Sequence, residues 1–516
     1  MIPIRKHRPA RYGICAAAVF IALSLAACSL APRYERPGQD IPAQWRKVDI
    51  GPAPLESDWW SRFNDPALTA LINEALRDNQ DLAQSLAKID SAAAQAGVAA
   101  SALFPSVAGA GQAGAQSVSE KAPNSPDYDS PLTGMSRSTT AYQLGLSSAW
   151  ELDLWGKYRN AHTYLTDVLL NTIVGHEALR LSLAGQTAQT YFAMLALDMQ
   201  LDTARRTLKT REDALGIYSS RYKQGDITEL DWLRARAEVE TARAQLHMIT
   251  IALDQAEAAL AVLVGRSPRG IVEDAVERGK TLNRLPSPPV LPEGLPSSLL
   301  ERRPDIRAAE YMLMAYNANI GVARAQFFPS ISLTGALGTM SSAVSNLFVP
   351  AAGFWNYGVS GSLPILDFGR NWYNLKDAEA QKQAAVAVYR KTVQSAFKDI
   401  RNSLTAQREA NAIVRSMSTQ VDSLRRSVEI ARLQYDNGYS DYLTVLDAER
   451  QLFSAELQLA NALRDRLDSV VSVCMALGGG WQDPRVSAGF PVDADKLRIR
   501  VASGTRKKAA EAEKTP

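Results

Sequence analysis

Side chains that commonly carry catalysis or hold metals are sparse in this chain. The 516 residues include three cysteines and four histidines. His162, His176 and His247 have no cysteine and no second histidine at the spacing of a metal site, so we expect surface or packing roles for them. Neither a G-x-S-x-G motif nor a P-loop occurs. We therefore predict no catalytic residues, no metal site and no enzyme activity.

One motif could bind a dinucleotide if its surroundings allowed it. Residues 109–114 are Gly-Ala-Gly-Gln-Ala-Gly, which fits the G-x-G-x-x-G pattern. In a dinucleotide site that pattern opens a helix whose N-terminus faces the pyrophosphate. Here a segment rich in Pro and Ser follows. We interpret the motif as a strand of small residues and predict no cofactor other than covalent lipid.

The cysteine with the most informative surroundings is Cys28. Residues 1–27 hold four basic residues and no acidic ones, and residues 13–27 are almost wholly apolar but too short to span a bilayer comfortably. The stretch ends in Leu-Ala-Ala-Cys, which resembles the lipobox of bacterial lipoproteins. That resemblance implies cleavage before Cys28 and acyl lipid on this residue. A plain signal peptide with a chance cysteine is the alternative.

The residue after Cys28 bears on its destination. Lipoproteins that stay at the inner membrane often have Asp at this position, whereas this chain has Ser29. The resemblance therefore implies a lipid anchor in the outer membrane, with the chain extending into the periplasm. Cys15 would leave with the signal peptide, so Cys474 would be the one free thiol and no disulfide framework is expected.

Composition narrows the remaining classes of fold and function. Hydrophobic residues make up 46% and charged residues 22% of the chain, which suits a folded protein with a large core. The net charge of +3 includes the four basic residues before Cys28, so the rest is close to neutral and lacks an electrostatic footprint for nucleic acid. Aromatic residues are few, at 7%, while Ala, Leu, Gln and Arg fill long stretches, which indicates a helix-rich fold.

An internal duplication organises the chain after residue 60. Gly-Val-Ala followed by Phe-Pro-Ser begins at Gly97 and again at Gly321, an offset of 224 in the numbering. Two further motifs recur at an offset of 213: an aromatic-Gly-base triplet at Trp155 and Phe368, and Tyr-x-x-Gly at Tyr222 and Tyr435. The offset thus decreases by 11 from the first motif to the later ones. This decrease predicts that the loop between the two strands is 11 residues longer in the first half than in the second. That loop lies within residues 117–140, which are rich in Ser, Pro and Gly.

Each half is predicted to contain a helix, two strands joined by a loop, a long helix, a turn and a returning helix. Alternation with period two predicts the strands. In three of them large apolar residues share one face: Tyr142, Leu144, Leu146, Trp150 and Leu152; Ile331, Leu333 and Leu337; and Trp355, Tyr357, Val359, Leu363 and Ile365. The remaining strand, near residues 106–118, consists largely of Gly and Ala.

Strands with one apolar and one polar face, about ten residues long, are typical of a membrane β-barrel with a wet lumen. A soluble sandwich sheet is the alternative. Four strands cannot close a barrel, and an open edge in lipid leaves backbone groups unpaired at a cost of several kcal/mol each. If these strands span a membrane, several copies of the chain must share one barrel.

The helices after the strands are unusually long. Residues 157–222 and 370–435 contain no Pro, and 66 residues at about 1.5 Å each give roughly 100 Å. The returning helix in the second half has two apolar seams, interrupted by Arg450: Val445, Ala448, Leu452, Ala455, Leu459 and Ala462; and Leu443, Leu446, Phe453, Leu457 and Ala460. Two seams predict a neighbour on each side, hence a layer of helices that can curve into a tube. A buried bundle helix is the alternative.

Lipobox, duplicated halves, Phe-Pro-Ser motifs and Tyr-x-x-Gly turns together resemble the TolC-like outer-membrane efflux factors. Residues 302–310, Arg-Arg-Pro-Asp-Ile-Arg-Ala-Ala-Glu, are similar to the acylated OprM or NodT branch, which serves resistance-nodulation-division pumps. The resemblance covers about residues 30–480. It implies a mainly α fold with a membrane β-barrel portion, closed as a homotrimer with twelve strands and twelve helices. It also implies three kinds of partner: a periplasmic adaptor, an inner-membrane transporter and outer-membrane lipid.

The resemblance further implies a gate where the long helices turn at the periplasmic tip. By motif, Asp447 occupies a ring-aspartate position, and Tyr435 matches a tyrosine that locks the turn. The residue one turn before Asp447 is often a second Asp in the family, but here it is Thr444, so the resemblance implies an inner ring that is either absent or displaced to Asp441. The candidate gate residues are Asp447, Asp231, Tyr435, Asp441, Glu229 and Asp226. Ordinary helix capping is the alternative role for the acids near helix starts.

The expected organisation is a signal peptide (1–27), a lipidated extended tether (28–60), a first repeat (61–270), a linker (271–302), a second repeat (303–480) and a largely disordered tail (481–516). The predicted function is the exit duct of a tripartite efflux pump. An exit duct of type I secretion, a lipid-anchored cell-wall enzyme and a coiled-coil tether are the alternatives. The sequence names no exported compound, because the pump selects it.

Overall fold

The computed structural model describes residues 29–42, 57–117, 119, 138–287 and 299–481. The chain forms two compact units. The first combines residues up to 36 with 91–169 and 311–386, and the second combines 37–90, 170–310 and the residues from 387 onwards. The predicted signal peptide, the predicted lipidation site Cys28 and the C-terminal tail from residue 482 lie outside the described residues.

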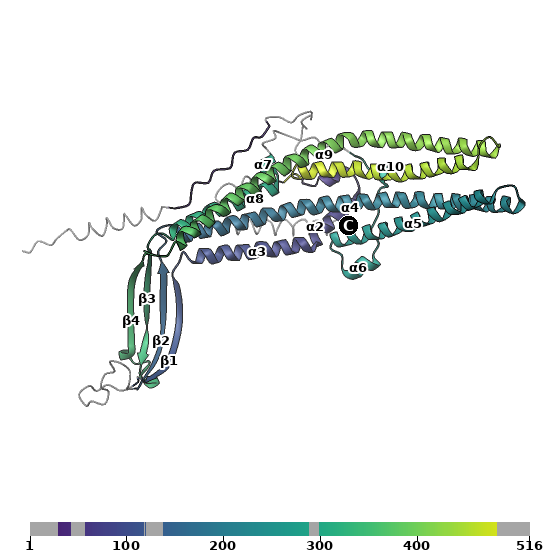
Figure 1. Ribbon diagram of the computed structural model, residues 1–516. Helices are drawn as coiled ribbons and strands as arrows, with labels where there is room; N and C mark the ends of the chain where they lie inside the picture. Colours follow the sequence, from purple (N-terminus) through teal and green to yellow (C-terminus); the bar gives the residue numbers. More distant parts are fainter. Residues whose placement is uncertain (1–28, 43–56, 118, 120–137, 288–298, 482–516) are drawn as a thin grey trace, which may run out of the picture. The chain divides into compact units, whose positions relative to one another are not determined.

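The first unit contains the sheet and the helix ends next to it (Figure 1). Its elements, some of them shared with the second unit, are α3 (Gln80–Ser101), β1 (Ser106–Ser117), β2 (Ser138–Glu151), the start of α4 (Lys157–Gln224), most of α8 (Pro304–Ala325), β3 (Ser330–Ser341), η4 (Val344–Asn346), η5 (Pro350–Ala352), β4 (Gly353–Ser362) and the start of α9 (Arg370–Asp436).

The sheet is antiparallel in the order β1-β2-β3-β4. Ser106 pairs with Ala149 in the first hairpin, and Ser330 pairs with Ser362 in the second. The first members of these two pairs differ by 224 in the numbering and the second members by 213, the same offsets that the sequence motifs have. The register thus confirms the duplication, strand by strand.

The register places the large apolar residues of β2, β3 and β4 together on one face of the sheet. Leu146 lies opposite Leu337, which lies opposite Trp355. Trp355 and Tyr357 stack on that face, with ring centroids 5.8 Å apart, and they are 74% and 81% exposed. The other face carries small and polar residues, such as Ser147 opposite Ala336. Within the described chain, the apolar face has no protein layer to bury it.

The second unit contains the helical hairpins (Figure 1). Its further elements are η1 (Trp59–Phe63), α2 (Pro66–Asp78), α5 (Glu229–Leu263), α6 (Pro268–Glu273), η2 (Leu282–Arg284), α7 (Leu299–Arg302) and α10 (Tyr442–Ala476). α4 and α9 have 68 and 67 residues, as the Pro-free stretches predicted, so each measures about 100 Å.

Four helices of this unit form a layer in the order α5-α4-α10-α9. Leu201 of α4 and Ile249 of α5 share an apolar cluster with Phe453 of α10. On its other side α10 pairs with α9 through Arg425–Glu456 and Arg432–Glu449 ion pairs. α10 therefore has a neighbour on each side, as its two apolar seams predicted.

The main core of this unit forms around η1 and α2. Trp59 and Phe63 are 1% and 0% exposed, so the extended segment ends before residue 60, the predicted end of the tether. Asp65 caps α2 and is itself buried; its carboxylate accepts hydrogen bonds from Ala67 N–H at 3.0 Å and from the Tyr191 hydroxyl at 2.9 Å. Trp59 and Trp60, at the end of the predicted tether, act as core because burying their rings outweighs the freedom of an extended segment.

Candidate functional site

The turn between α4 and α5 holds three of the predicted gate acids. Thr228 is the N-cap of α5: its hydroxyl accepts a hydrogen bond from the Asp231 N–H at 3.2 Å and donates one to the Asp231 carboxylate at 2.8 Å. Arg234 lies 3.6 Å from the other carboxylate oxygen of Asp231. Asp231 therefore takes part in a reciprocal cap. Asp226 and Glu229 are exposed beside it.

The turn between α9 and α10 repeats this cap with the residue types exchanged. The Asp441 carboxylate accepts hydrogen bonds from the N–H of Thr444 at 3.1 Å and from its hydroxyl at 2.8 Å. These bonds hold the pKa of Asp441 below its ordinary value. In the duplication, Asp441 and Thr444 are the counterparts of Thr228 and Asp231. Both turns thus start their returning helix with one Thr and one Asp three residues apart, and the Asp441 carboxylate is committed to the cap.

Asp447 lies deeper in α10, outside the cap. Its side chain is exposed and accepts a hydrogen bond from Gln451 Nε2 at 2.6 Å, one turn further along the same helix. Its neighbours Val445 and Leu446 are 3% and 5% exposed because they face the helix layer. Asp447 is thus an acid near the turn that no capping role explains.

An aromatic cluster, formed by Tyr218, Tyr435 and Tyr442, ties three helices together next to the turns. The rings of Tyr218 and Tyr442 are 4.2 Å apart, and Tyr435 lies 5.6 Å from Tyr442 and 6.1 Å from Tyr218. Burial raises the pKa of Tyr218 and of Tyr442 above the ordinary value, so both hydroxyls stay neutral. The sequence predicted Tyr435 for this place but missed the other two tyrosines.

A buried carboxylate links three helices further along the same hairpins. Glu238 of α5 is 8% exposed, and its two carboxylate oxygens lie 2.9 Å from Arg211 of α4 and 3.1 Å from Arg450 of α10. Arg211 also donates a hydrogen bond to the main-chain oxygen of Glu238 at 3.0 Å and lies over the ring of Phe453. We call Glu238, Arg211 and Arg450 the ionic clamp. It fixes α10 to the α4–α5 hairpin.

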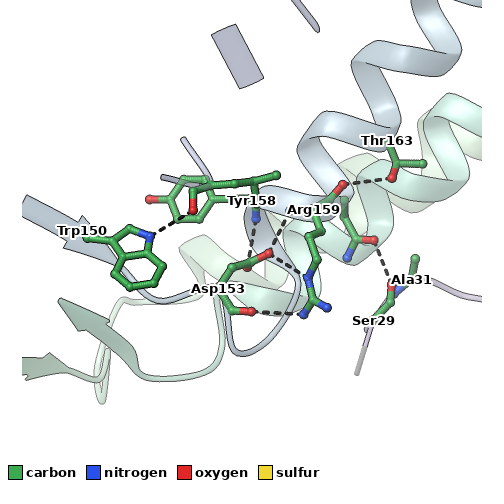
Figure 2. A network of polar contacts seen from close by, with 9 residues as sticks. Ser29, Ala31, Trp150, Asp153, Tyr158, Arg159 and Thr163 are labelled. Atoms are coloured by element: carbon green, nitrogen blue, oxygen red, sulfur yellow. Dashed lines mark hydrogen bonds and ion pairs between the residues drawn. The ribbon is translucent and has the colours of Figure 1, made fainter. Parts of the chain in front are cut away.

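The residues after Cys28 are held against α4 and α8 within the first unit. Ser29 donates a hydrogen bond to the Asn160 side chain at 2.8 Å, close to the turn where Asp153 caps α4 (Figure 2). Asn317 and Arg324 of α8 donate to the main-chain oxygens of residues 32 and 30. A side chain at Gly321 would collide with Ala31, so this glycine provides the space in which the segment lies.

The other residues with potential chemistry have packing roles. His176 is 2% exposed, with Nδ1 2.6 Å from the Ser85 hydroxyl, and burial lowers the pKa of His176 to about 4, so it is a neutral core histidine. Burial raises the pKa of the Cys474 thiol to about 12. Residues 109–114 lie within β1, as expected, and not at a helix start. The described residues contain no cluster of three or more potential metal ligands.

Known proteins are similar to this chain over nearly its whole length. The solvent efflux pump outer membrane protein SrpC of Pseudomonas putida is 35% identical over 475 residues, which are 90% of this chain and 97% of SrpC. The cation efflux system protein CusC of Escherichia coli O6:H1 is 34% identical over 90% of this chain and 98% of its own length.

The crystal structure of the Campylobacter jejuni CmeC outer membrane channel superposes with a TM-score of 0.84 at 26% identity, covering 93% of this chain and 99% of CmeC. These similarities confirm the predicted fold class, the outer-membrane location and the role in efflux. The family model for outer membrane efflux proteins matches residues 71–266 and again 295–479, one match in each half. The chain belongs to the outer membrane efflux protein family.

Proposed function

We propose that three copies of this chain form the passive exit duct of a tripartite efflux pump. The observation that carries the proposal is the sheet: four strands, one continuous exposed apolar face, and two edge strands that each have one neighbour in the described chain. Lipid is the solvent in which such a face is stable. In lipid the free backbone groups of β1 and β4 need partners, and further copies of the same strands supply them.

The edges of the helix layer support the same assembly. α5 and α9 flank the layer, and both expose large apolar side chains: Leu230, Leu233, Met248, Ile251 and Val262 on α5; Val388, Ile413, Ile430 and Leu433 on α9. Among the described residues, α5 is also the one helix apolar and long enough to cross a membrane by composition alone. We assign its exposed stripe to contact with α9 of the next copy, which extends the layer into a closed tube.

Conductance measurements in planar lipid bilayers test whether the protein forms a duct. Purified protein in detergent is expected to insert and give stepwise ion currents, because the wet face of the barrel lines a pore. No catalysis and no resident cofactor are part of the proposed mechanism. A preparation that hydrolyses cell-wall material as a monomer and conducts nothing would refute it.

The gate is proposed to lie at the helical turns, with Asp447 as its ring acid. Three symmetry-related carboxylates close to a narrow axis repel one another, attract cations and bias which solutes pass. Asp447 supports this role because its carboxylate is exposed and outside any cap. Asp231 and Asp441 are proposed to shape the two turns, and Tyr435 to hold them through the aromatic cluster. Asp226 and Glu229 add negative charge at the first turn.

Replacing both Asp447 and Asp231 with Asn is expected to loosen the closed tip. Asn keeps the size of each side chain and can still take part in a cap, so the charge is the property that changes. Single-channel conductance and sensitivity of cells to vancomycin should both rise. Asp465→Asn, an exposed acid further along α10, serves as the matched control. If the double variant behaves like this control, the ring assignment is wrong.

The lipid on Cys28 is proposed to anchor the chain where the segment from Ser29 to Pro32 lies against α4 and α8. Because the strands themselves hold the protein in the membrane, Cys28→Ala is expected to abolish acylation and still leave the protein in the outer-membrane fraction. Metabolic labelling with a fatty-acid analogue and membrane fractionation measure the two effects separately. Complete loss of the variant from the membrane would show that lipid, and not the strands, holds it there.

The proposed partners are a periplasmic adaptor and an inner-membrane transporter of the resistance-nodulation-division class. The support is the full-length similarity to SrpC, a solvent efflux pump protein, and to CusC, a cation efflux system protein. Those two cargo classes differ widely, although both relatives match this chain equally well. We therefore assign the choice of exported compound to the transporter and leave to the duct only the charge bias of its gate acids. Co-purification after mild crosslinking in cells identifies the adaptor and the transporter.

A further inference from the structure

A cavity of about 570 Å³ lies between α4 and α9, next to the end of α10. Both long helices, the last turns of α10 and residues 303–305 line this cavity, which we call the α4–α9 pocket. All of these residues belong to the second unit. Its volume lies in the range that suits a drug-sized molecule. The apolar part of its lining consists of Ala178, Leu181, Pro304, Ala406, Met475 and Ala476.

Arg303, which lines the pocket, holds the end of α10, and an uncharged residue does the same for α5. Arg303 Nη1 donates a hydrogen bond to the main-chain oxygen of Ala476 at 3.1 Å. In the duplication, Asn79 and Leu263 are the counterparts of Arg303 and Ala476. Asn79 Nδ2 donates to the main-chain oxygen of Leu263 at 2.9 Å. The end of each returning helix therefore needs a hydrogen-bond donor at this place, and a positive charge is not required.

The charges that line the pocket do not cancel. Asp305 accepts hydrogen bonds from Arg303 Nε at 3.0 Å and Nη2 at 2.7 Å, which neutralises the guanidinium. Asp399 of α9 lies 3.6 Å from the same Nη2 and 3.4 Å from Lys398, whose side chain is 65% exposed and screened by solvent. Both distances exceed the roughly 2.7–2.9 Å of a charge-assisted hydrogen bond. Asp399, whose counterpart in the first half is the uncharged Gln186, thus leaves a surplus negative charge.

We propose that the α4–α9 pocket binds an organic cation with an apolar body. The charged group of the ligand lies against the Asp399 carboxylate, and its apolar part lies against Leu181, Pro304 and Met475. An anion would meet the surplus negative charge, and an uncharged molecule would cover Asp399 without supplying a counter-charge. An inorganic cation would leave the apolar lining unused. An amphipathic organic cation is the class that satisfies both the charge and the walls.

Protection of an engineered cysteine measures occupancy of the pocket itself. Asn402 lines the pocket and is exposed, so Asn402→Cys should react with a small maleimide. The full-length variant in detergent is labelled with 4-phenylbutylammonium or 4-phenylbutanol present, two compounds that share a carbon skeleton and differ in charge. Mass spectrometry of the peptide that contains residue 402 follows the reaction. The ammonium compound is expected to slow labelling at a concentration about fivefold lower than the alcohol does.

Three further variants separate the charge, the walls and the place. Asp399→Asn, added to Asn402→Cys, should raise the protective concentration of the ammonium compound about fivefold and leave that of the alcohol unchanged. Asp422→Asn removes an exposed acid elsewhere on α9 and should change neither value. Ala406→Trp fills the pocket and should weaken protection by both compounds. Thr405→Cys, exposed on α9 outside the pocket lining, should be labelled at the same rate with and without either compound.

Each other outcome overturns a defined part of the proposal. Equal protection by the two compounds would show an apolar pocket with no preference for a cation. Slower labelling at residue 405 as well as at residue 402 would show a general effect of the compounds and no site. A cysteine at residue 402 that fails to react without ligand would show that the pocket is closed in the assembled protein. If Asp399→Asn fails to assemble, the comparison of ammonium and alcohol in the unaltered pocket still decides.

Discussion

Lysine in place of Val359 is expected to keep the protein out of the outer membrane, whereas lysine at the adjacent Ser360 is expected to be tolerated. Val359 lies on the apolar face, opposite Leu333, and is 72% exposed. A lysine facing lipid near the middle of a barrel strand costs about 2–4 kcal/mol, and every copy in the barrel carries that cost. Ser360 lies on the polar face, where a lysine side chain is solvated by water.

The two variants change neighbouring residues to the same side chain, so strand propensity and net charge are matched. The measurement is the amount of protein in the outer-membrane fraction, together with its resistance to extraction at alkaline pH. Val359→Lys should lose most of its membrane-inserted protein. Ser360→Lys should insert and change the ion preference of the channel. Equal insertion of both variants would mean that the apolar face does not contact lipid.

Glu238→Gln is expected to open the tip of the duct more strongly than any single gate acid does. The substitution leaves the Arg211 guanidinium, whose side chain is 5% exposed, without a counter-charge. Removing one partner of a buried ion pair costs about 3–5 kcal/mol. Arg450 is 63% exposed, so solvent screens its share of the attraction. Loss of the ionic clamp removes the charged contact between α10 and the α4–α5 hairpin, weakens their packing near the turns and should raise both channel open time and vancomycin sensitivity.

A surface pair between the same two helices provides the control. Glu212 of α4 lies 2.8 Å from Arg243 of α5, and both side chains are 40% or more exposed. Glu212→Gln should change stability by less than about 1 kcal/mol and leave gating unchanged. Replacing Glu238 and Arg211 together with Met should restore much of the stability, because no buried charge is left alone. Wild-type gating in Glu238→Gln would remove the clamp from the mechanism.

Much of the fold could be predicted because it follows from periodic patterns. Alternation along β2, β3 and β4 identified the apolar face, and the register places those residues in rows as expected. The two offsets between repeated motifs equal the differences in numbering between corresponding residues of β1 and β3 and of β2 and β4. Long Pro-free stretches gave α4 and α9 to within two residues at their ends. Each of these features depends on local sequence.

The ionic clamp and the aromatic cluster could not be predicted in the same way. Arg211, Glu238 and Arg450 belong to three helices, and each looks like one more charged residue on an amphipathic helix. Their meeting depends on which helices become neighbours. One local sign did exist: Arg450 interrupts an apolar seam, and the structure accounts for it by the contact with Glu238. Tyr218 and Tyr442 gave no such sign.

The gate acids show where motif comparison and local chemistry diverge. Asp441 was a candidate for the inner acidic ring, yet its carboxylate binds Thr444 as a helix cap. Asp231 likewise binds Thr228. The exchange of Thr and Asp between the two turns preserves the cap and moves the charge by three residues. Helix capping accounts for the acid at each of the two turns, and neither acid is needed for an acidic ring. The gate proposal therefore depends on Asp447.

The mass of the intact particle in detergent decides whether several copies of the chain share one barrel. Four strands in one chain leave two edges, so several chains must share one barrel, and the resemblance to trimeric efflux factors sets the number at three. We therefore expect a particle of three acylated chains that conducts ions in a bilayer. Native mass spectrometry counts the chains, and the same preparation serves for the conductance measurement. A conducting particle with the mass of a single chain would contradict the account.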